Sequence, residues 1–228
     1  MLFWRQIEGW LGEKCISTSL LIGLNQDYLR YNNVIIPGED GTTQIDHIVL
    51  STRGIFVIET KNYHGWIFGT QDDRTWKAKH PLRTYTFQNP LRQNYRHIKA
   101  LMTFLDLPEE CFISVVYFVG CCVFHDQQPA NVLTEGIIPY ITSFQKPKLI
   151  PQDVNACSHK LFNLQTNNPI SFSTHMRSLQ ERHANTEKCP SCGYNLVVRE
   201  NKLGGKFIGC TGYPDCHYSR RGTQLRSV

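Results

Sequence analysis

Two carboxylates and one ammonium group occur in neighbouring segments that have the composition of β-strands. Asp46 lies in the first segment, Glu59 and Lys61 lie in the second, and a tight turn at Arg53-Gly54 separates the two. Alternate residues of a strand share a face, so antiparallel pairing across this turn would bring Asp46 close to Glu59 and Lys61. A strand whose face changes from apolar to charged suits a core poorly, and we expect its charged end to open into a site.

This combination of groups suits a hard divalent cation bound beside a phosphate. Mg²⁺ is held by one or two carboxylates and keeps several waters, and it stabilises negative charge on a phosphodiester. A neighbouring lysine would orient the attacking water or neutralise the phosphate. The alternative is an exposed hairpin in which Glu59 and Lys61 form a surface ion pair worth about 0–1 kcal/mol. Strand alternation alone leaves both interpretations open.

Periodicity predicts the elements that would position these groups. A helix is expected over the first twenty or so residues, with Trp4, Ile7, Leu11 and Cys15 on one apolar stripe. Short strand-like runs punctuated by glycine and proline follow and suit the hairpins of a meander. They cover residues 34–36, 44–51, 55–63 and 66–68.

A second helix is predicted to begin at Asn89, the N-cap, with Pro90 at its first position, and to end at Pro108. Gln93 and His97 lie one turn apart on it, opposite its apolar stripe; for His97, a solvated and a functional face are both open. A strand covered on both faces is expected at 112–119. Weaker helix signals lie at 152–162 and 174–183.

Composition and charge limit the classes of protein that fit. The 228 residues are 41% hydrophobic, too apolar for a disordered chain, and no uncharged apolar run reaches the ~18 residues of a membrane helix. The early charged residues do not fit a secretory signal, so we expect a cytoplasmic protein without a membrane partner. The net charge of +5 is unevenly spread: residues 1–73 are acidic overall, whereas residues 74–99 carry seven basic side chains and no acidic one. A polyanion is the first candidate partner.

The basic middle segment mixes cationic and aromatic side chains, as nucleic-acid grooves do. Arg92, Arg96 and Lys99 would share one flank of the helix that begins after Asn89 and could contact successive phosphates. A solvated helix flank is the alternative.

The cysteines are distributed unequally. Of nine, Cys189, Cys192, Cys210 and Cys216 form two close pairs near the end of the chain, and the other five are scattered among apolar neighbours. Four thiolates in two pairs suit a closed, structural Zn²⁺ site, and His217 is the less favoured ligand. A segment of about 40 residues needs such a metal to fold. The remaining cysteines are expected to be ordinary small core residues.

The first part of the chain resembles the nuclease-related domain (NERD) family of the PD-(D/E)XK nuclease superfamily, over residues 5–145 and more loosely to the Leu179 region. The matching features are Gly12-Glu13, Gln44-Ile45-Asp46, Glu59-Thr60-Lys61-Asn62 thirteen residues later, Gly65-Trp66-Ile67 with Trp76, and Asn89-Pro90 followed by Gln93. The superfamily's usual proline before the aspartate is replaced by Ile45, which is ordinary in this family.

This resemblance implies an α/β, restriction-endonuclease-like core, with a central mixed sheet flanked by helices. Asp46, Glu59 and the carbonyl of Thr60 would hold Mg²⁺ or Mn²⁺, and Lys61 would be the catalytic lysine. Glu13 would complete the acidic set, and Gln93 would be the glutamine of the helix that borders the active site. Some superfamily members keep the fold without the activity, but the full set of acids and lysine argues against that here.

The last part of the chain resembles the zinc ribbons of bacterial type IA topoisomerases, which bind single-stranded DNA. The resemblance implies DNA contacts from Arg199, Lys206, Phe207 and Tyr213. The expected domains are therefore a nuclease-like domain at 1–183, a linker at 184–188 and a small four-cysteine zinc ribbon at 189–228.

Together these features predict a Mg²⁺-dependent DNA endonuclease whose ribbon holds DNA, with single-stranded, nicked or branched DNA favoured. A non-catalytic DNA-binding adaptor with a vestigial nuclease fold is the rival from another class. Cleavage of RNA would use the same residues and stays open.

Overall fold

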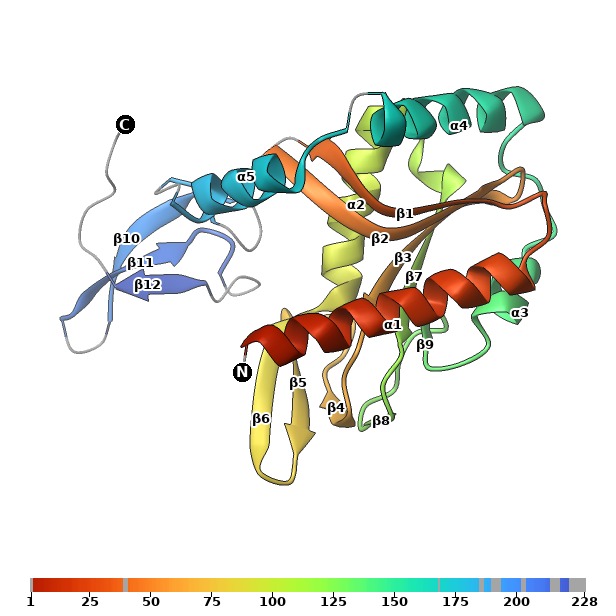
Figure 1. Ribbon diagram of the computed structural model, residues 1–228. Helices are drawn as coiled ribbons and strands as arrows, with labels where there is room; N and C mark the ends of the chain where they lie inside the picture. The colour runs from red at the N-terminus through yellow and green to blue at the C-terminus, as the bar shows by residue number, and fades with distance from the viewer. Residues whose placement is uncertain are drawn as a thin grey trace. The chain divides into compact units, whose positions relative to one another are not determined.

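The computed structural model describes residues 2–38, 41–167, 169–184, 187–189, 194–201, 204–213 and 218–221. Contacts divide the chain into two compact units, one of Met1–Gly38 with Thr43–Ile170 and the other of Glu39–Thr42 with Ser171–Val228 (Figure 1). The expected boundaries at 183, 184–188 and 189 stay a prediction, since the contacts place the last long helix with the second unit. No helix in the described ranges is long and apolar enough to cross a membrane.

The first unit is built around a five-stranded mixed sheet with the order β1-β2-β3-β7-β9. Its strands are β1 (Leu29–Gly38), β2 (Gly41–Ser51), β3 (Gly54–Lys61), β7 (Phe112–Phe118) and β9 (Val132–Leu133). β2 and β3 form the expected hairpin, and β3 runs parallel to β7, which runs parallel to β9. The strand β3 therefore lies in the centre of the sheet.

A second sheet of four strands, ordered β6-β5-β4-β8, belongs to the same unit. It contains β4 (Gly65–Phe68), β5 (Thr75–His80), β6 (Arg83–Gln88) and β8 (Cys122–Phe124). The prediction of one continuous meander is wrong at residues 66–68, because β4 pairs with β5 and β8 instead of extending the first sheet. Trp76 is fully buried and stacks near Phe118 of β7, with ring centroids 6.0 Å apart.

Helices cover both faces of the central sheet (Figure 1). Ile55 and Val57 of β3 pack in one apolar cluster with helix α2 (Pro90–Leu105) and helix α4 (Pro151–Thr166). Phe56 and Ile58 point the other way, into a cluster with α1 (Leu2–Gly23) and α3 (Ile137–Thr142). Strand β3 is buried on both faces over most of its length. Its last residues, Glu59 to Lys61, therefore bring charged side chains to the edge of an apolar core.

Helix α2 begins as predicted and ends earlier than predicted. The side chain of Asn89 accepts a hydrogen bond from the backbone N–H of Leu91, and Pro90 is the first helical residue. The helix stops at Asp106, which adopts a left-handed conformation with φ of 61°. Pro108 lies beyond that stop, before the short 3₁₀ helix η1 (Glu109–Cys111), so it does not end the helix.

The buried face of α1 differs from the predicted stripe. Cys15 is exposed, whereas Ile16 and Leu20 are buried, which moves the buried face by one residue at this position. Trp4, Ile7 and Leu11 have side chains outside the described part. Cys111 and Cys157 are core residues as expected, but Cys121 is exposed like Cys15, so the prediction for those two is wrong.

The second unit contains helix α5 (Phe172–Ala184) and a three-stranded antiparallel sheet. Its strands are β10 (Leu196–Glu200), β11 (Lys206–Cys210) and β12 (Ser219–Arg221). Leu196 and Ile208 are buried with Cys189 and Cys210 in a small cluster of their own. A cluster this small, as found among the described residues, contributes little burial energy, so a bound metal would add stability that the module needs.

Candidate functional site

The hairpin of β2 and β3 brings Asp46 to the charged end of β3. His47 pairs with Ile58 in the antiparallel register, so Asp46 falls beside Glu59 and Thr60. The backbone N–H of Thr60 donates a hydrogen bond of 2.8 Å to Oδ2 of Asp46. Burial raises the pKa of Asp46 well above its ordinary value, the Glu59 carboxylate raises it further, and the Thr60 hydrogen bond offsets only part of the shift.

Glu59 is the most enclosed charged group of this region, with 2% of its surface exposed. The Lys61 ammonium lies 2.5 Å from its Oε1, and Nε2 of His97 lies 3.1 Å from its Oε2. Burial by itself would raise the pKa of Glu59, but the Lys61 charge and the His97 hydrogen bond outweigh it and lower the pKa to about 2. The carboxylate is therefore held ionised by partners on both of its oxygens.

Helix α2 supplies the second side of the site. The Lys61 ammonium also donates a hydrogen bond of 3.0 Å to Oε1 of Gln93. One residue further along, Asn94 is completely buried and its amide donates to the carbonyl oxygens of Val57 and Val115, at 2.7 and 3.1 Å. These two bonds fasten α2 to β3 and β7 directly beneath the site, so Gln93 is presented to Lys61 by a fixed helix turn.

Glu13 reaches the same region from helix α1. Gly12 lies so close to the end of β3 that an added Cβ would sit 3.3 Å from Cβ of Asn62. Burial raises the pKa of Glu13, and the Glu59 carboxylate raises it further, whereas Lys61 lowers it. Glu13 is thus near enough to feel both charges, and the structure brings together all the predicted residues of the first unit's acidic set.

Three residues around Glu59 received no role in the site from the sequence. His97 is buried, and its Nδ1 lies 2.8 Å from the hydroxyl of Thr43. This hydrogen bond between His97 and Thr43 links α2 to β2 beside Glu59. The position of His97 one helical turn after Gln93 indicates that it could face the site, but no sequence pattern indicates a role for Thr43. His47 is also buried, with Nδ1 2.7 Å from Oδ1 of Asn32, and burial lowers its pKa to about 4, so it is uncharged near neutral pH.

The basic flank of α2 has protein partners as well as exposed surface. The guanidinium of Arg92 donates a hydrogen bond of 2.8 Å to the carbonyl of Asp72. The ammonium of Lys99 lies 2.7 Å from Glu109 in an exposed ion pair, and it sits 5.0 Å from the centre of the Tyr95 ring. Arg96 is partly exposed on the same helix. Phosphate binding by Arg92, Arg96 and Lys99 stays a prediction.

In the second unit, two of the four predicted zinc ligands fall among the described residues. Cys189 and Cys210 are buried at 2% and 1% exposure, in the same small cluster, as a structural metal site requires. Cys192 and Cys216 lie outside the described residues. The complete set of four ligands therefore stays a prediction.

Three of the four predicted DNA contacts of the ribbon lie close together, whereas Lys206, next to Phe207 in β11, falls on the other face of the sheet. Arg199 and Phe207 are opposite each other in the register of β10 and β11. Their side chains cover Gly209, where an added Cβ would lie 2.9 Å from Cδ of Arg199 and 3.1 Å from Cε2 of Phe207. The Arg199 guanidinium lies 5.6 Å from the centre of the Tyr213 ring, which is 58% exposed. Lys206 is exposed at the start of β11.

Comparison with known protein families agrees with this geometry. Residues 8–119 match the family model described as Nuclease-related domain. The chain contains a nuclease-related domain. This domain is restriction-endonuclease-like, and the mixed sheet flanked by helices confirms the predicted fold class. Residues 186–224 match the model described as Topoisomerase DNA binding C4 zinc finger, which confirms the predicted ribbon.

Similar proteins match portions of the chain that differ widely in length. An uncharacterized protein of Bacillus anthracis is 29% identical over 182 residues, which are 78% of this chain and 86% of that protein. DNA topoisomerase 1 of Archaeoglobus fulgidus is 59% identical over 32 residues, 14% of this chain and 5% of the topoisomerase. The uncharacterized protein YrdD of Escherichia coli is 53% identical over 36 residues, 16% of this chain and 19% of that protein. No solved structure matches the chain.

The donor set of the nuclease-related domain fits a divalent cation on electrostatic grounds. Burial raises the pKa values of Asp46 and Glu13, and the Glu59 carboxylate raises both further, so a nearby cation would relieve this repulsion. In the described ranges, no group of three or more His, Cys, Asp or Glu side chains is arranged to hold a metal ion. A site of two carboxylates and a backbone carbonyl remains compatible with Mg²⁺, which retains several waters.

Proposed function

We propose that this protein is a DNA endonuclease that hydrolyses phosphodiester bonds with Mg²⁺ or Mn²⁺. The observation that carries the proposal is the meeting of Asp46, Glu59 and Lys61 at the end of a central strand, with the Lys61 ammonium bonded to both Glu59 and Gln93. A nuclease-related domain followed by a zinc finger of the topoisomerase type supports DNA as the partner.

Each group has a separate task in the proposed reaction. Asp46, Glu59 and the Thr60 carbonyl would hold the cation, which when bound lowers the pKa of a coordinated water and stabilises charge on the phosphate. The Lys61 ammonium would orient the attacking water or neutralise the phosphate. Gln93 accepts a hydrogen bond from Lys61 and so restricts where that ammonium points. Glu13 would complete the acidic set from α1.

Charged side chains beyond this centre would bind the strand. Arg92, Arg96 and Lys99 lie on the helix that also carries Gln93, so phosphates held there would lead toward the site. The ion pair of Lys99 with Glu109 is exposed to solvent and contributes little, so a phosphate could replace Glu109 there. Arg199, Lys206, Phe207 and Tyr213 would hold a single-stranded, nicked or branched part of the DNA, by stacking and by charge.

The proposal is tested by cleavage of plasmid and oligonucleotide DNA in Mg²⁺, Mn²⁺ or EDTA. We expect Lys61→Ala and Glu59→Gln to lower the rate by about 100- to 1,000-fold, the usual cost of losing one preorganised charge in an active site. Lys146→Ala and Glu135→Gln remove the same charges from exposed positions and should cut like the parent. Cleavage by Lys61→Ala at the parent rate would show that the site is wrongly assigned.

The same assay decides which polymer and which shape are cut. Duplex, single-stranded and branched DNA are compared, and RNA of the same sequence is added as competitor. We expect single-stranded or branched DNA to be preferred, because the aromatic side chains of Phe207 and Tyr213 would stack on unpaired bases. Preferential cleavage of the RNA would replace DNA as the substrate while leaving the catalytic residues unchanged.

A non-catalytic DNA-binding adaptor is favoured by one observation. Both carboxylate oxygens of Glu59 already have partners within the protein, Lys61 and His97, so a cation must share this carboxylate with them. An adaptor would bind DNA with the same affinity in EDTA and in Mg²⁺ and would leave every substrate uncut. Calorimetric titration of the protein with Mg²⁺ and Mn²⁺, run beside the cleavage assay, separates the two functions.

A further inference from the structure

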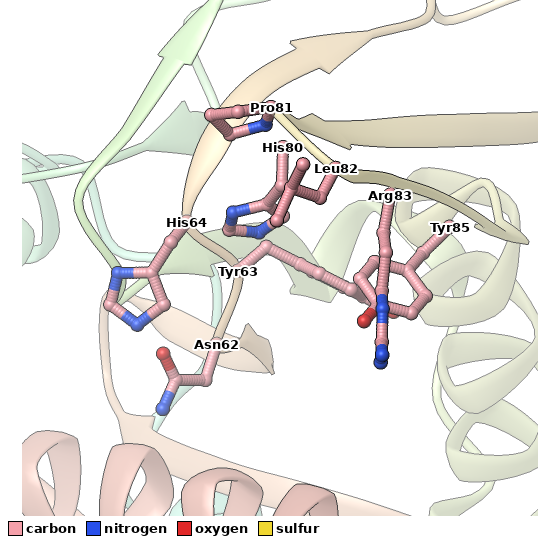
Figure 2. Close-up of a pocket in the computed structure, with 8 residues that line it drawn as sticks. All are labelled: Asn62, Tyr63, His64, His80, Pro81, Leu82, Arg83 and Tyr85. Carbon is pink, nitrogen blue, oxygen red and sulfur yellow. The ribbon is translucent and has the colours of Figure 1, made fainter.

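A pocket of about 530 Å³ lies just beyond the end of β3. Two segments form its walls, the residues that follow β3 and the hairpin of β5 and β6 (Figure 2). Its lining includes Asn62, Tyr63, His80, Leu82, Arg83 and Tyr85. A volume of this size falls in the range of small-ligand sites, roughly 300–1,000 Å³.

The lining of the pocket begins one residue after Lys61 of the proposed catalytic centre. Asn62 and Tyr63 directly follow Lys61 in the chain and line the pocket. A strand cut at that centre would therefore lie beside the pocket.

The wall that carries Tyr63 is held in place. The Tyr63 ring stacks on the ring of Phe87 in β6, with centroids 4.2 Å apart and planes inclined by 20°. Behind it, the backbone of Gly120 packs so tightly that a Cβ there would collide with the carbonyl oxygen of Tyr63. The backbone N–H of Cys121 donates a hydrogen bond of 3.2 Å to Nδ1 of His64, the next residue. A preformed wall loses little conformational entropy when a ligand binds.

The chemistry of the lining selects for a ligand that is both flat and anionic. Two phenol rings, two imidazoles, a guanidinium and an amide line the pocket, and none of its eight lining residues is Asp or Glu. Tyr85 meets His80 edge-on, with ring centroids 6.1 Å apart. Rings of this kind stack on nucleobases, and a guanidinium binds phosphate in a bidentate way.

The tip of the hairpin adds an apolar group at the rim. Leu82 is 94% exposed, next to Pro81 in the turn between β5 and β6. Exposed apolar side chains beside basic and aromatic ones are used by nucleic-acid-binding proteins to separate neighbouring bases. A base taken into the pocket would have to be unstacked from its neighbour, and Leu82 stands where it could fill the gap.

We infer that this pocket binds one unpaired nucleotide of the substrate strand, with its base against Tyr85 and its phosphate toward Arg83. The inference rests on the proposed function, because it names the form of nucleic acid that this site would accept. It extends that function by giving the nuclease-related domain its own contact with a single-stranded nucleotide, apart from the ribbon.

Binding is measured in EDTA with the full chain and a fluorescein-labelled single-stranded oligonucleotide of about twelve nucleotides, beside the same backbone with abasic sites. We expect Tyr85→Ala to weaken binding of the intact oligonucleotide by roughly 5- to 150-fold, as for the loss of one stacked base, and to change binding of the abasic one much less. Tyr85→Phe keeps the ring and should restore the parent affinity. Phe162→Ala removes an aromatic ring exposed elsewhere and should bind like the parent.

Arg83→Ala tests the phosphate contact. It should weaken the intact and the abasic oligonucleotides alike, by more than Lys146→Ala, which removes an exposed charge far along the sequence. Every variant is compared with the parent by circular dichroism so that only folded proteins are scored. The Tyr85 effect should also persist in a Tyr213→Ala background, because Tyr213 belongs to the ribbon.

The outcomes separate this inference from the proposed activity. If Mg²⁺-dependent cleavage is observed but Tyr85→Ala and Arg83→Ala bind both oligonucleotides like the parent, the pocket assignment is overturned and the activity stands. If no substrate is cut but Tyr85→Ala selectively weakens the intact oligonucleotide, the activity is overturned and the pocket stands.

Discussion

Nε2 of His97 lies 3.1 Å from Oε2 of Glu59, and the other nitrogen of the same ring lies 2.8 Å from the hydroxyl of Thr43. A carboxylate only accepts hydrogen bonds, so the ring donates from Nε2, and in its neutral form Nδ1 accepts from Thr43. The Glu59 carboxylate therefore sets the position of the ring proton, and the hydrogen bond with Thr43 helps to hold the ring orientation. Glu59 is thereby fixed between His97 and Lys61 before any cation arrives.

His97→Asn should raise the metal concentration needed for half-maximal activity. Groups that orient a metal-ligating carboxylate typically contribute about 10- to 100-fold in metal affinity or activity, and we expect a change in that range. The measurement is a Mg²⁺ and Mn²⁺ titration of initial cleavage rate, with His159→Asn as the control because His159 is exposed on α4. A variant that needs no more metal than the parent would leave His97 with a packing role only.

Asn94→Ala should destabilise the first unit rather than alter its chemistry directly. The Asn94 amide satisfies the carbonyls of Val57 and Val115 in the buried interior, and it contacts the hydroxyl of Ser114 at 2.9 Å. Leaving buried polar groups unpaired costs about 1–3 kcal/mol each. Urea unfolding should therefore show a free energy of unfolding lower by at least about 1 kcal/mol.

The matched control for Asn94 is Asn163→Ala, an exposed asparagine on α4. Its unfolding midpoint should stay within experimental error of the parent. Equal midpoints for the two variants would mean that the bonds from α2 to β3 and β7 add nothing to stability.

The second unit should contain about one zinc ion per chain, measured by elemental mass spectrometry. Cys189→Ser and Cys210→Ser should lower that content, whereas Cys15→Ser, an exposed cysteine of α1, should not. A chelator should expose the ribbon to protease, since structural zinc supplies much of the folding energy of such modules. Full zinc content in both Ser variants would place the metal elsewhere.

Tyr213→Ala should weaken binding of single-stranded DNA by about 5- to 150-fold, the cost of one lost base stack. Tyr194→Ala is its control, because Tyr194 is 63% exposed in the same unit and is not among the predicted contacts. Fluorescence anisotropy at one fixed salt concentration gives both affinities. Similar losses in the two variants would remove Tyr213 from its assigned role.

Much of the candidate site could be predicted because its parts are close in sequence. The turn at Arg53-Gly54 and the two-residue period of a strand are enough to set Asp46 beside Thr60, as observed. The capping chemistry of Asn89 and Pro90 likewise fixes the start of α2. In both cases the local sequence determines the geometry over a few residues.

The remainder depends on contacts that local patterns do not encode. The parallel pairing of β3 with β7 sets Glu59 beside Val116, although three strands and a helix lie between them in the sequence. No local pattern in either strand indicates its pairing partner. The link from Thr43 to His97 spans 54 residues. The sequence does not predict the hairpin of β5 and β6, because its basic and aromatic side chains indicate a binding segment and this composition conceals the strand period.

The Asn89 amide donates to the carbonyls of Thr70, Gln71 and Asp73, and Trp76 of the second sheet donates to the same Thr70 carbonyl. The helix that holds Gln93 against Lys61 and the sheet that contributes to the pocket are thus hydrogen-bonded to the same loop, residues 70–73. The spacing between a nucleotide in the pocket and the phosphate at Lys61 would be constant. Such an enzyme would cut every strand at the same number of nucleotides from the base bound in the pocket. Sequencing of the cleaved ends would show this distance as a single cleavage position.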